Sequence, residues 1–156
     1  MIMLVTSLLL SGAASVVLIE SWGNVAEANG DNAAERAADA ETDVSFSGDR
    51  GDIFLDTSGA NQEITLYFQN TGVRFLDKSS YTIFVDGVAS GTVGAATLYP
   101  ANGVWAPDYV LEVTVSDSSF SYTDQELAIV TIVVQSTSID GSIGVDSETA
   151  EVRLSV

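Results

Sequence analysis

The residues of this chain that could carry chemistry are carboxylates and hydroxyls, because it contains no histidine and no cysteine. A hydrolase needs a nucleophile with a base in hydrogen-bond reach, and histidine is the usual base near neutral pH. The single lysine, Lys78, lies in a segment typical of an ordinary turn. Paired carboxylates can hydrolyse glycosides, but 22 acidic residues spread along a chain form pairs by chance. We therefore expect no catalytic residue and predict that the protein is not an enzyme.

Oxygen atoms are the only metal ligands available, so Ca²⁺ and Mg²⁺ are the ions to consider. Two Gly-containing loops, residues 49–52 and residues 140–146, each begin and end with aspartate. Neither follows the twelve-residue spacing of an EF-hand, and both Asp and Gly are common turn residues. We attribute these loops to turns and predict no metal site and no cofactor.

The charge balance limits the partners that the protein can have. Five basic residues against 22 acidic ones give a formal net charge of -17. Such a field repels phosphate, so nucleic acid and anionic lipid headgroups are poor partners. A carboxylate-rich, lysine-poor surface suits high salt, where screening removes most of the self-repulsion. We interpret the chain as a halophilic acidic protein.

The N-terminal segment is the most apolar part of the chain, since residues 1–19 carry no charge. A bilayer core is spanned by roughly 20 apolar residues. Three interpretations of this segment are open. The first is a cleaved secretory signal with a small-x-small site at Ala26-Glu27-Ala28. The others are a permanent membrane anchor and a pilin-type helix that is buried in a filament after assembly. The first basic residue is Arg36, which disfavours a signal peptide. We favour the pilin-type helix and keep the other two open.

Residues 1–41 are rich in alanine and contain no proline, so we expect one long helix. About 40 residues make a rod of about 60 Å, which exceeds the thickness of a bilayer. The apolar side chains Leu4, Leu8, Leu9 and Val16 are predicted to pack in the helical core of a filament.

From Asp43 onward the hydrophobic period is two, which predicts strands with one buried face. The apolar members of three such runs are Ile64, Leu66 and Phe68; Leu111, Val113 and Val115; and Ala150, Val152, Leu154 and Val156. The dipeptide Asp86-Gly87 predicts a hairpin between its flanking strands. With turn signals about every ten residues, the pattern is typical of an antiparallel β-sandwich.

The run from Leu127 to Val134 is apolar on both faces, as in a central strand or in one whose outer face meets another subunit. We assign its uniformly aliphatic face, which includes Ile132, to the core. The other face is interrupted by Thr131 and is assigned to a neighbouring subunit or to the N-terminal helix. Ile129 and Val133 are therefore candidates for subunit contact.

Three segments together resemble archaellins, the type IV pilin-like subunits of the archaeal flagellum. Residues 64–72 (Ile-Thr-Leu-Tyr-Phe-Gln-Asn-Thr-Gly) are similar to the strand and Asn-x-Gly turn that open the archaellin β-domain. Residues 81–87 (Tyr-Thr-Ile-Phe-Val-Asp-Gly) resemble the hairpin that follows. Trp105-Ala106-Pro107 resembles the Trp-x-Pro start of a strand seen especially in the G-type subunit of the archaellum.

The resemblance implies an α+β protein, with a long N-terminal hydrophobic helix (residues 1–41) followed by an antiparallel immunoglobulin-like β-sandwich (residues 42–156). It implies a structural subunit of an archaellum or related type IV pilus-like filament that polymerises through its helix for motility. The expected partners are other copies of the chain, other archaellum subunits, an S-layer, and the membrane before assembly. The expected location is an extracellular appendage of an archaeal envelope. The alternative is a membrane-anchored module that links the filament machinery to the S-layer or cell wall.

Overall fold

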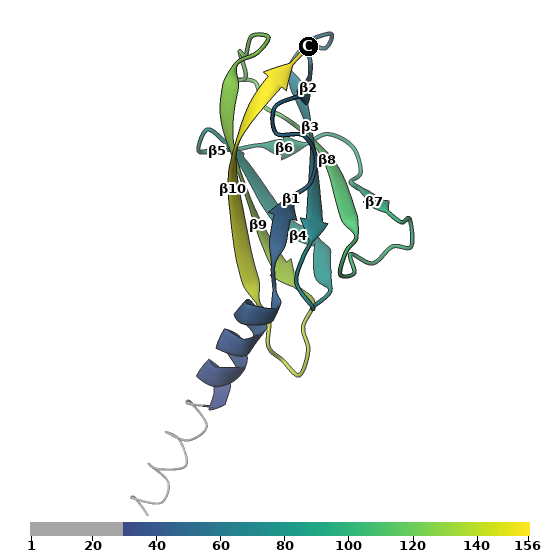
Figure 1. The fold of residues 1–156 in the computed structure, drawn as a ribbon, viewed down its shortest axis with the longest axis vertical. Coiled ribbons are helices and arrows are strands. Elements are labelled where there is room, and N and C mark those ends of the chain that lie inside the picture. The colour runs from purple at the N-terminus through teal and green to yellow at the C-terminus, as the bar shows by residue number, and fades with distance from the viewer. Residues whose placement is uncertain (1–29) are drawn as a thin grey trace, which may run out of the picture. The chain divides into compact units, whose positions relative to one another are not determined.

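The structure, a computed structural model, describes residues 30–156 (Figure 1). The chain divides into two compact units, residues 1–36 and residues 37–156, and the described strands all belong to the second unit. The predictions for Leu4, Leu8, Leu9 and Val16 lie outside the described residues. The role proposed for these four side chains therefore stays a prediction.

The predicted fold class, an α+β protein with a long hydrophobic N-terminal helix, is wrong for the part of the chain that the structure describes. That part is mostly β-sheet, with one short helix over residues 30–41. The short helix carries both acidic and basic side chains, and Ala38 is its single buried residue. No helix within residues 30–156 is both long and apolar enough to cross a membrane.

The last turn of this helix is fixed to the strands by polar contacts. The hydroxyl of Thr42 donates to the carbonyl oxygen of Ala38 at 2.7 Å and so ends the helix. The carboxylate of Asp39 accepts a hydrogen bond from the backbone N–H of Val145 at 2.9 Å. The carboxylate of Glu41 is 2.8 Å from the guanidinium of Arg74, whose side chain is almost fully buried. Residues 37–42 are therefore part of the β-domain.

The strands form two layers. The first sheet has the order β5-β4-β9-β10, made of Val88–Ala89, Leu76–Val85, Leu127–Ser136 and Val145–Ser155. The second sheet is centred on β3 (Glu63–Asn70) and β8 (Val110–Ser116). Two strands, β1 (Val44–Phe46) and β2 (Ile53–Asp56), pair with β3. Two others, β6 (Gly91–Thr92) and β7 (Thr97–Tyr99), pair with β8. The short strands β5, β6 and β7 limit the length of open edge that could pair with another chain.

The two sheets are joined by β10 and β2, which pair in parallel through Leu154↔Ile53 and Ser155↔Phe54. The other pairings are antiparallel, so the predicted antiparallel arrangement is correct except at this junction. The hairpin predicted at Asp86-Gly87 joins β4 to β5, and both of its residues have positive φ, +49° and +80°. Positive φ at both central positions is the requirement of a type I′ turn.

One hydrophobic core lies between the two sheets and is built from the alternate residues that the sequence pattern predicts. The apolar runs of β3 and β8 are buried at every predicted position, and so are those of β9 and β10 up to Leu154. Val156 lies beyond the end of β10 and is 65% exposed, so its predicted burial is wrong. Lys78 lies within β4 and not in a turn.

Candidate functional site

The outward side of the first sheet is the first candidate surface, and β9 runs along its middle. The exposed fraction is 0% for Ile132 and 50% for Ile129. This confirms the predicted register of β9: Ile132 points into the core and Ile129 away from it. Leu127, two residues earlier on the same side, is 49% exposed.

The cross-strand neighbours of this row are uncharged along the half that holds Thr131 and Val133. Val133 lies between Thr82 of β4 and Ser147 of β10, and Thr131 lies between Phe84 and Thr149. We call this set the outer β9 face; its members are Thr82, Phe84, Leu127, Ile129, Thr131, Val133, Ser147 and Thr149. The hydroxyls of Thr131 and Thr149 are 2.9 Å apart and hydrogen-bond to each other. Charge appears only at one end of the face, where Glu151 is paired with Ile129 and Arg153 with Leu127.

A shallow hollow of about 320 Å³ lies at the other end of the outer β9 face. Its lining consists of Ser79, Ser80, Tyr81, Thr82, Val133 and Gln135. None of these side chains carries a charge. Val133, one of the two residues predicted for subunit contact, therefore borders a polar but uncharged depression.

The backbone beneath Ile129 is held by Asp86 at the β4–β5 hairpin. The N–H of Asp86 donates to the carbonyl oxygen of Ile129, and the N–H of Ile129 donates to Oδ1 of Asp86, both at 2.8 Å. The other carboxylate oxygen, Oδ2, accepts a hydrogen bond from the hydroxyl of Tyr122 at 2.6 Å. Partial burial raises the pKa of Tyr122, and this hydrogen bond to Asp86 raises it further. The exposed end of β9 is thus hydrogen-bonded to the β4–β5 hairpin.

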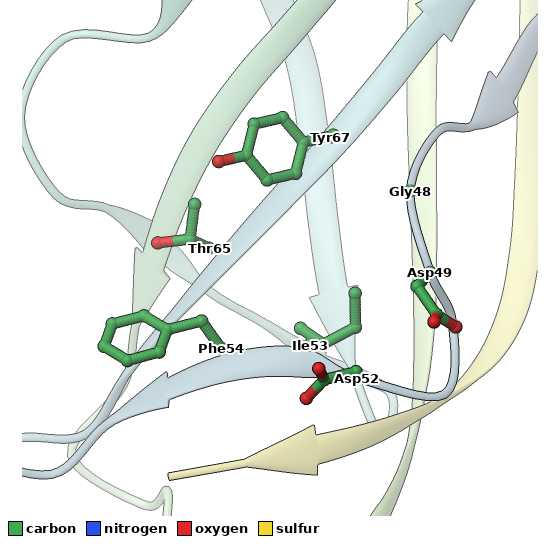
Figure 2. A pocket seen from close by; sticks show the side chains of 7 residues that line it. All are labelled: Gly48, Asp49, Asp52, Ile53, Phe54, Thr65 and Tyr67. Carbon is green, nitrogen blue, oxygen red and sulfur yellow. The ribbon is translucent and has the colours of Figure 1, made fainter.

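The second sheet carries a separate cleft of about 360 Å³ on its outward side (Figure 2). Its lining comes from the β1–β2 loop, from β2 and from β3: Gly48, Asp49, Asp52, Ile53, Phe54, Thr65 and Tyr67. The pairing Leu55↔Ile64, continued by one residue, places Phe54 beside Thr65 on the outward face. Phe54 is 59% exposed, whereas Tyr67 is partly buried.

The β1–β2 loop is brought beside Tyr67 by its backbone. The N–H of Ser47 donates to the carbonyl oxygen of Tyr67 at 2.8 Å. Gly48 follows with φ +125°, a conformation that other residues rarely adopt. Burial raises the pKa of Tyr67, and the adjacent carboxylate of Glu112 raises it further.

The two acidic loops singled out in the sequence have structural roles. Asp49 Oδ1 accepts the N–H of Gly51 at 2.8 Å, and Asp146 Oδ2 accepts the N–H of Val44 from β1 at 3.0 Å. Within residues 30–156, no group of three or more acidic side chains is placed to hold a metal ion. The cleft was not predicted from the sequence. Its one local signal is Phe54, a large apolar side chain at the outward position between the buried Ile53 and Leu55.

Comparisons with known proteins give little further information. No family model and no curated protein matches the chain. The structure is similar to the crystal structure of AggA, the major subunit of aggregative adherence fimbriae type I from Escherichia coli, with 10% sequence identity and a TM-score of 0.30. The similarity covers 73% of this chain and 93% of AggA. A TM-score of 0.30 is too low to establish a common fold.

Proposed function

We propose that this protein is a non-enzymatic structural subunit of an extracellular surface filament. The observation that carries the proposal is the outer β9 face, which exposes about half of Leu127 and of Ile129 and continues through Thr131 and Val133. The cross-strand neighbours of Thr131 and Val133 are uncharged. In a chain with a net charge of -17, this row of uncharged side chains is a place where the repulsion between two acidic copies is reduced. Contiguous exposed apolar surface commonly marks an interaction site.

The uncharged residues 1–19 support the same conclusion from the sequence. A long apolar segment is unfavourable in water and is stable in a membrane or when packed against other copies. A subunit that uses one surface to contact a different surface of the next copy forms an open filament and not a closed ring. The apolar segment and the outer β9 face would then be two of the surfaces that form this repeated contact.

We further propose that the filament is of the archaellum or type IV pilus kind. The support is the resemblance of residues 64–72, 81–87 and 105–107 to archaellin segments. The acidic, lysine-poor composition agrees with an extracellular position in high salt. Self-association is then the main interaction, and other archaellum subunits and the membrane before assembly are further partners.

Electron microscopy of the purified full-length protein tests the proposal, with Ile129→Asp as the decisive variant. We expect long, uniform filaments from the wild type and a loss of filaments from Ile129→Asp, because a carboxylate would be buried in the contact. Ile139→Asp is the matched control, since Ile139 has a similar exposed fraction, 44% against 50%, and lies in the loop between β9 and β10, outside the outer β9 face. Filaments from Ile129→Asp that equal those of the wild type would exclude the outer β9 face as a subunit contact.

The second candidate is a membrane-anchored module that binds the S-layer or cell wall, and the cleft of the second sheet is the feature that favours it. Monomers or short rods from the wild type, together with binding to isolated envelopes, would support this function. Filaments without envelope binding would support the first.

A further inference from the structure

The cleft of the second sheet combines aromatic surface with carboxylates. Asp52, which precedes β2, and Phe54 of β2 both line the cleft, and strand alternation turns Thr65 and Tyr67 of β3 to that same side. The rings of Phe54 and Tyr67 and the hydroxyl of Thr65 line the same hollow as Asp49 and Asp52, and no basic residue lines it (Figure 2). Aromatic walls with a few polar groups are typical of sites for small ligands.

The one basic residue of the adjoining loop is held elsewhere. The guanidinium of Arg50 is 3.0 Å from Glu148 of β10 and lies 5.6 Å from the centre of the Phe46 ring. Arg50 is therefore paired on the β10 side of its loop, and neither of the ion pairs in residues 30–156 involves Asp52. An anion would be repelled from such a cleft, whereas an organic cation would find both a carboxylate and aromatic faces, the two groups that attract it.

We propose that this cleft binds an alkylammonium group, and that in the assembled filament the group is the side chain of Lys78 from a second copy. The assignment to a second copy rests on the filament function proposed above. Lys78 is the single lysine of the chain and is exposed on β4. The two ion pairs within residues 30–156, Arg50–Glu148 and Arg74–Glu41, do not involve it.

The positions of donor and acceptor determine the kind of contact. Lys78 belongs to the first sheet and the cleft to the second. A lysine of one copy in the cleft of the next therefore joins two different surfaces, which is the heterologous contact that propagates along a filament. The contact also places a cation among the carboxylates of a chain whose net charge is -17, where it relieves repulsion between copies.

The first experiment tests the cleft alone, on full-length protein in detergent. n-Butylammonium is titrated while the ring-proton resonances of Phe54 and Tyr67 are followed by NMR, and n-butanol serves as the neutral control. We expect the resonances to shift with the amine and not with the alcohol, and Asp52→Asn to weaken the affinity about tenfold. Asp56→Asn removes the same charge from β2 outside the cleft and should leave the affinity unchanged. Equal weakening by both variants, or no shift with the amine, would overturn the site.

The second experiment tests the source of the ammonium in assembly. Lys78→Gln should raise the protein concentration required for filament formation about tenfold, and Lys78→Arg should not. Lys78→Asp combined with Asp52→Lys should restore assembly that each change alone weakens. Filaments of Lys78→Gln that form as readily as the wild type would overturn Lys78 as the donor, whatever the amine titration gives. A wild type that forms no filaments would refute the filament function and the Lys78 contact, while the titration would still decide whether the cleft binds an alkylammonium group.

Discussion

The side-chain amide of Asn70 donates a hydrogen bond to the carbonyl oxygen of Trp105 at 3.1 Å. Both residues are fully buried, and each belongs to one of the short segments that resemble archaellins. The same amide donates to the carbonyl oxygen of Arg74 at 2.8 Å, and its oxygen accepts the N–H of Gly72 at 3.1 Å. The ring nitrogen of Trp105 donates in turn to the carbonyl oxygen of Tyr109 at 3.0 Å. One side chain thus joins the turn after β3 to the segment before β8.

Asn70→Ala should therefore destabilise the domain by about 2 kcal/mol, because it removes the side-chain donor of the Arg74 carbonyl and one of two donors of the Trp105 carbonyl, which keeps the N–H of Leu76. Urea denaturation followed by circular dichroism measures the change. Asn61→Ala, at an exposed position, is the control and should alter stability by less than about 0.5 kcal/mol. Equal stability of the two variants would show that water replaces the lost donors.

The register of β9 predicts that an isoleucine-to-alanine substitution lowers the free energy of unfolding more at position 132 than at position 129. Ile132→Ala should destabilise the domain by about 2–5 kcal/mol, because it opens a cavity in the core. Ile129→Ala should cost less than about 1 kcal/mol, because half of its side chain is already exposed. Urea midpoints of the two variants provide the comparison. A large cost at Ile129 would mean that its side chain is covered within the monomer.

The partial burial of Tyr122 and its hydrogen bond to Asp86 predict a loss of stability in alkali. The pKa of Tyr122 is raised in the folded protein above its unfolded value of about 10, so the folded state holds the proton more tightly. This contribution is complete below about pH 10 and is lost as the pH rises toward the folded pKa. Stability measured by urea denaturation should therefore fall above about pH 10, and less steeply in Tyr122→Phe. In Tyr122→Phe, stability should still fall somewhat with rising pH, because the pKa values of Tyr67 and Tyr99 are also raised. A variant with an unchanged slope would contradict the role of Tyr122.

The net charge of -17 predicts that salt stabilises the protein. Repulsion between exposed carboxylates falls as the Debye length shortens from about 10 Å at 0.1 M to about 3 Å at 1 M. The melting temperature and the extent of assembly should both be higher in 1 M than in 0.1 M NaCl. KCl at the same concentrations should act equally if screening is the cause. A stability that is flat or decreasing with salt would remove the halophilic interpretation of the acidity.

The sequence alone determined which side of each long strand is buried. Ile64, Leu66 and Phe68 alternate with polar neighbours, and a period of two leaves one arrangement that buries them together. Asp86-Gly87 determined the hairpin for a similarly local reason, since few residue pairs adopt positive φ twice in succession. In β9 the outer face was correctly separated from the core because Thr131 interrupts one side and not the other.

Features that depend on contacts between distant segments could be known only from the tertiary structure. The parallel pairing of β10 with β2 joins Leu154 to Ile53 across most of the chain, and alternation within a strand does not identify its partner. The amide of Asn70 reaches Trp105 only because β3 and β8 are neighbours in the second sheet. The cleft likewise forms where Asp52 and Phe54 come beside Thr65, so neither of its halves could be recognised as a site before the sheets were assembled.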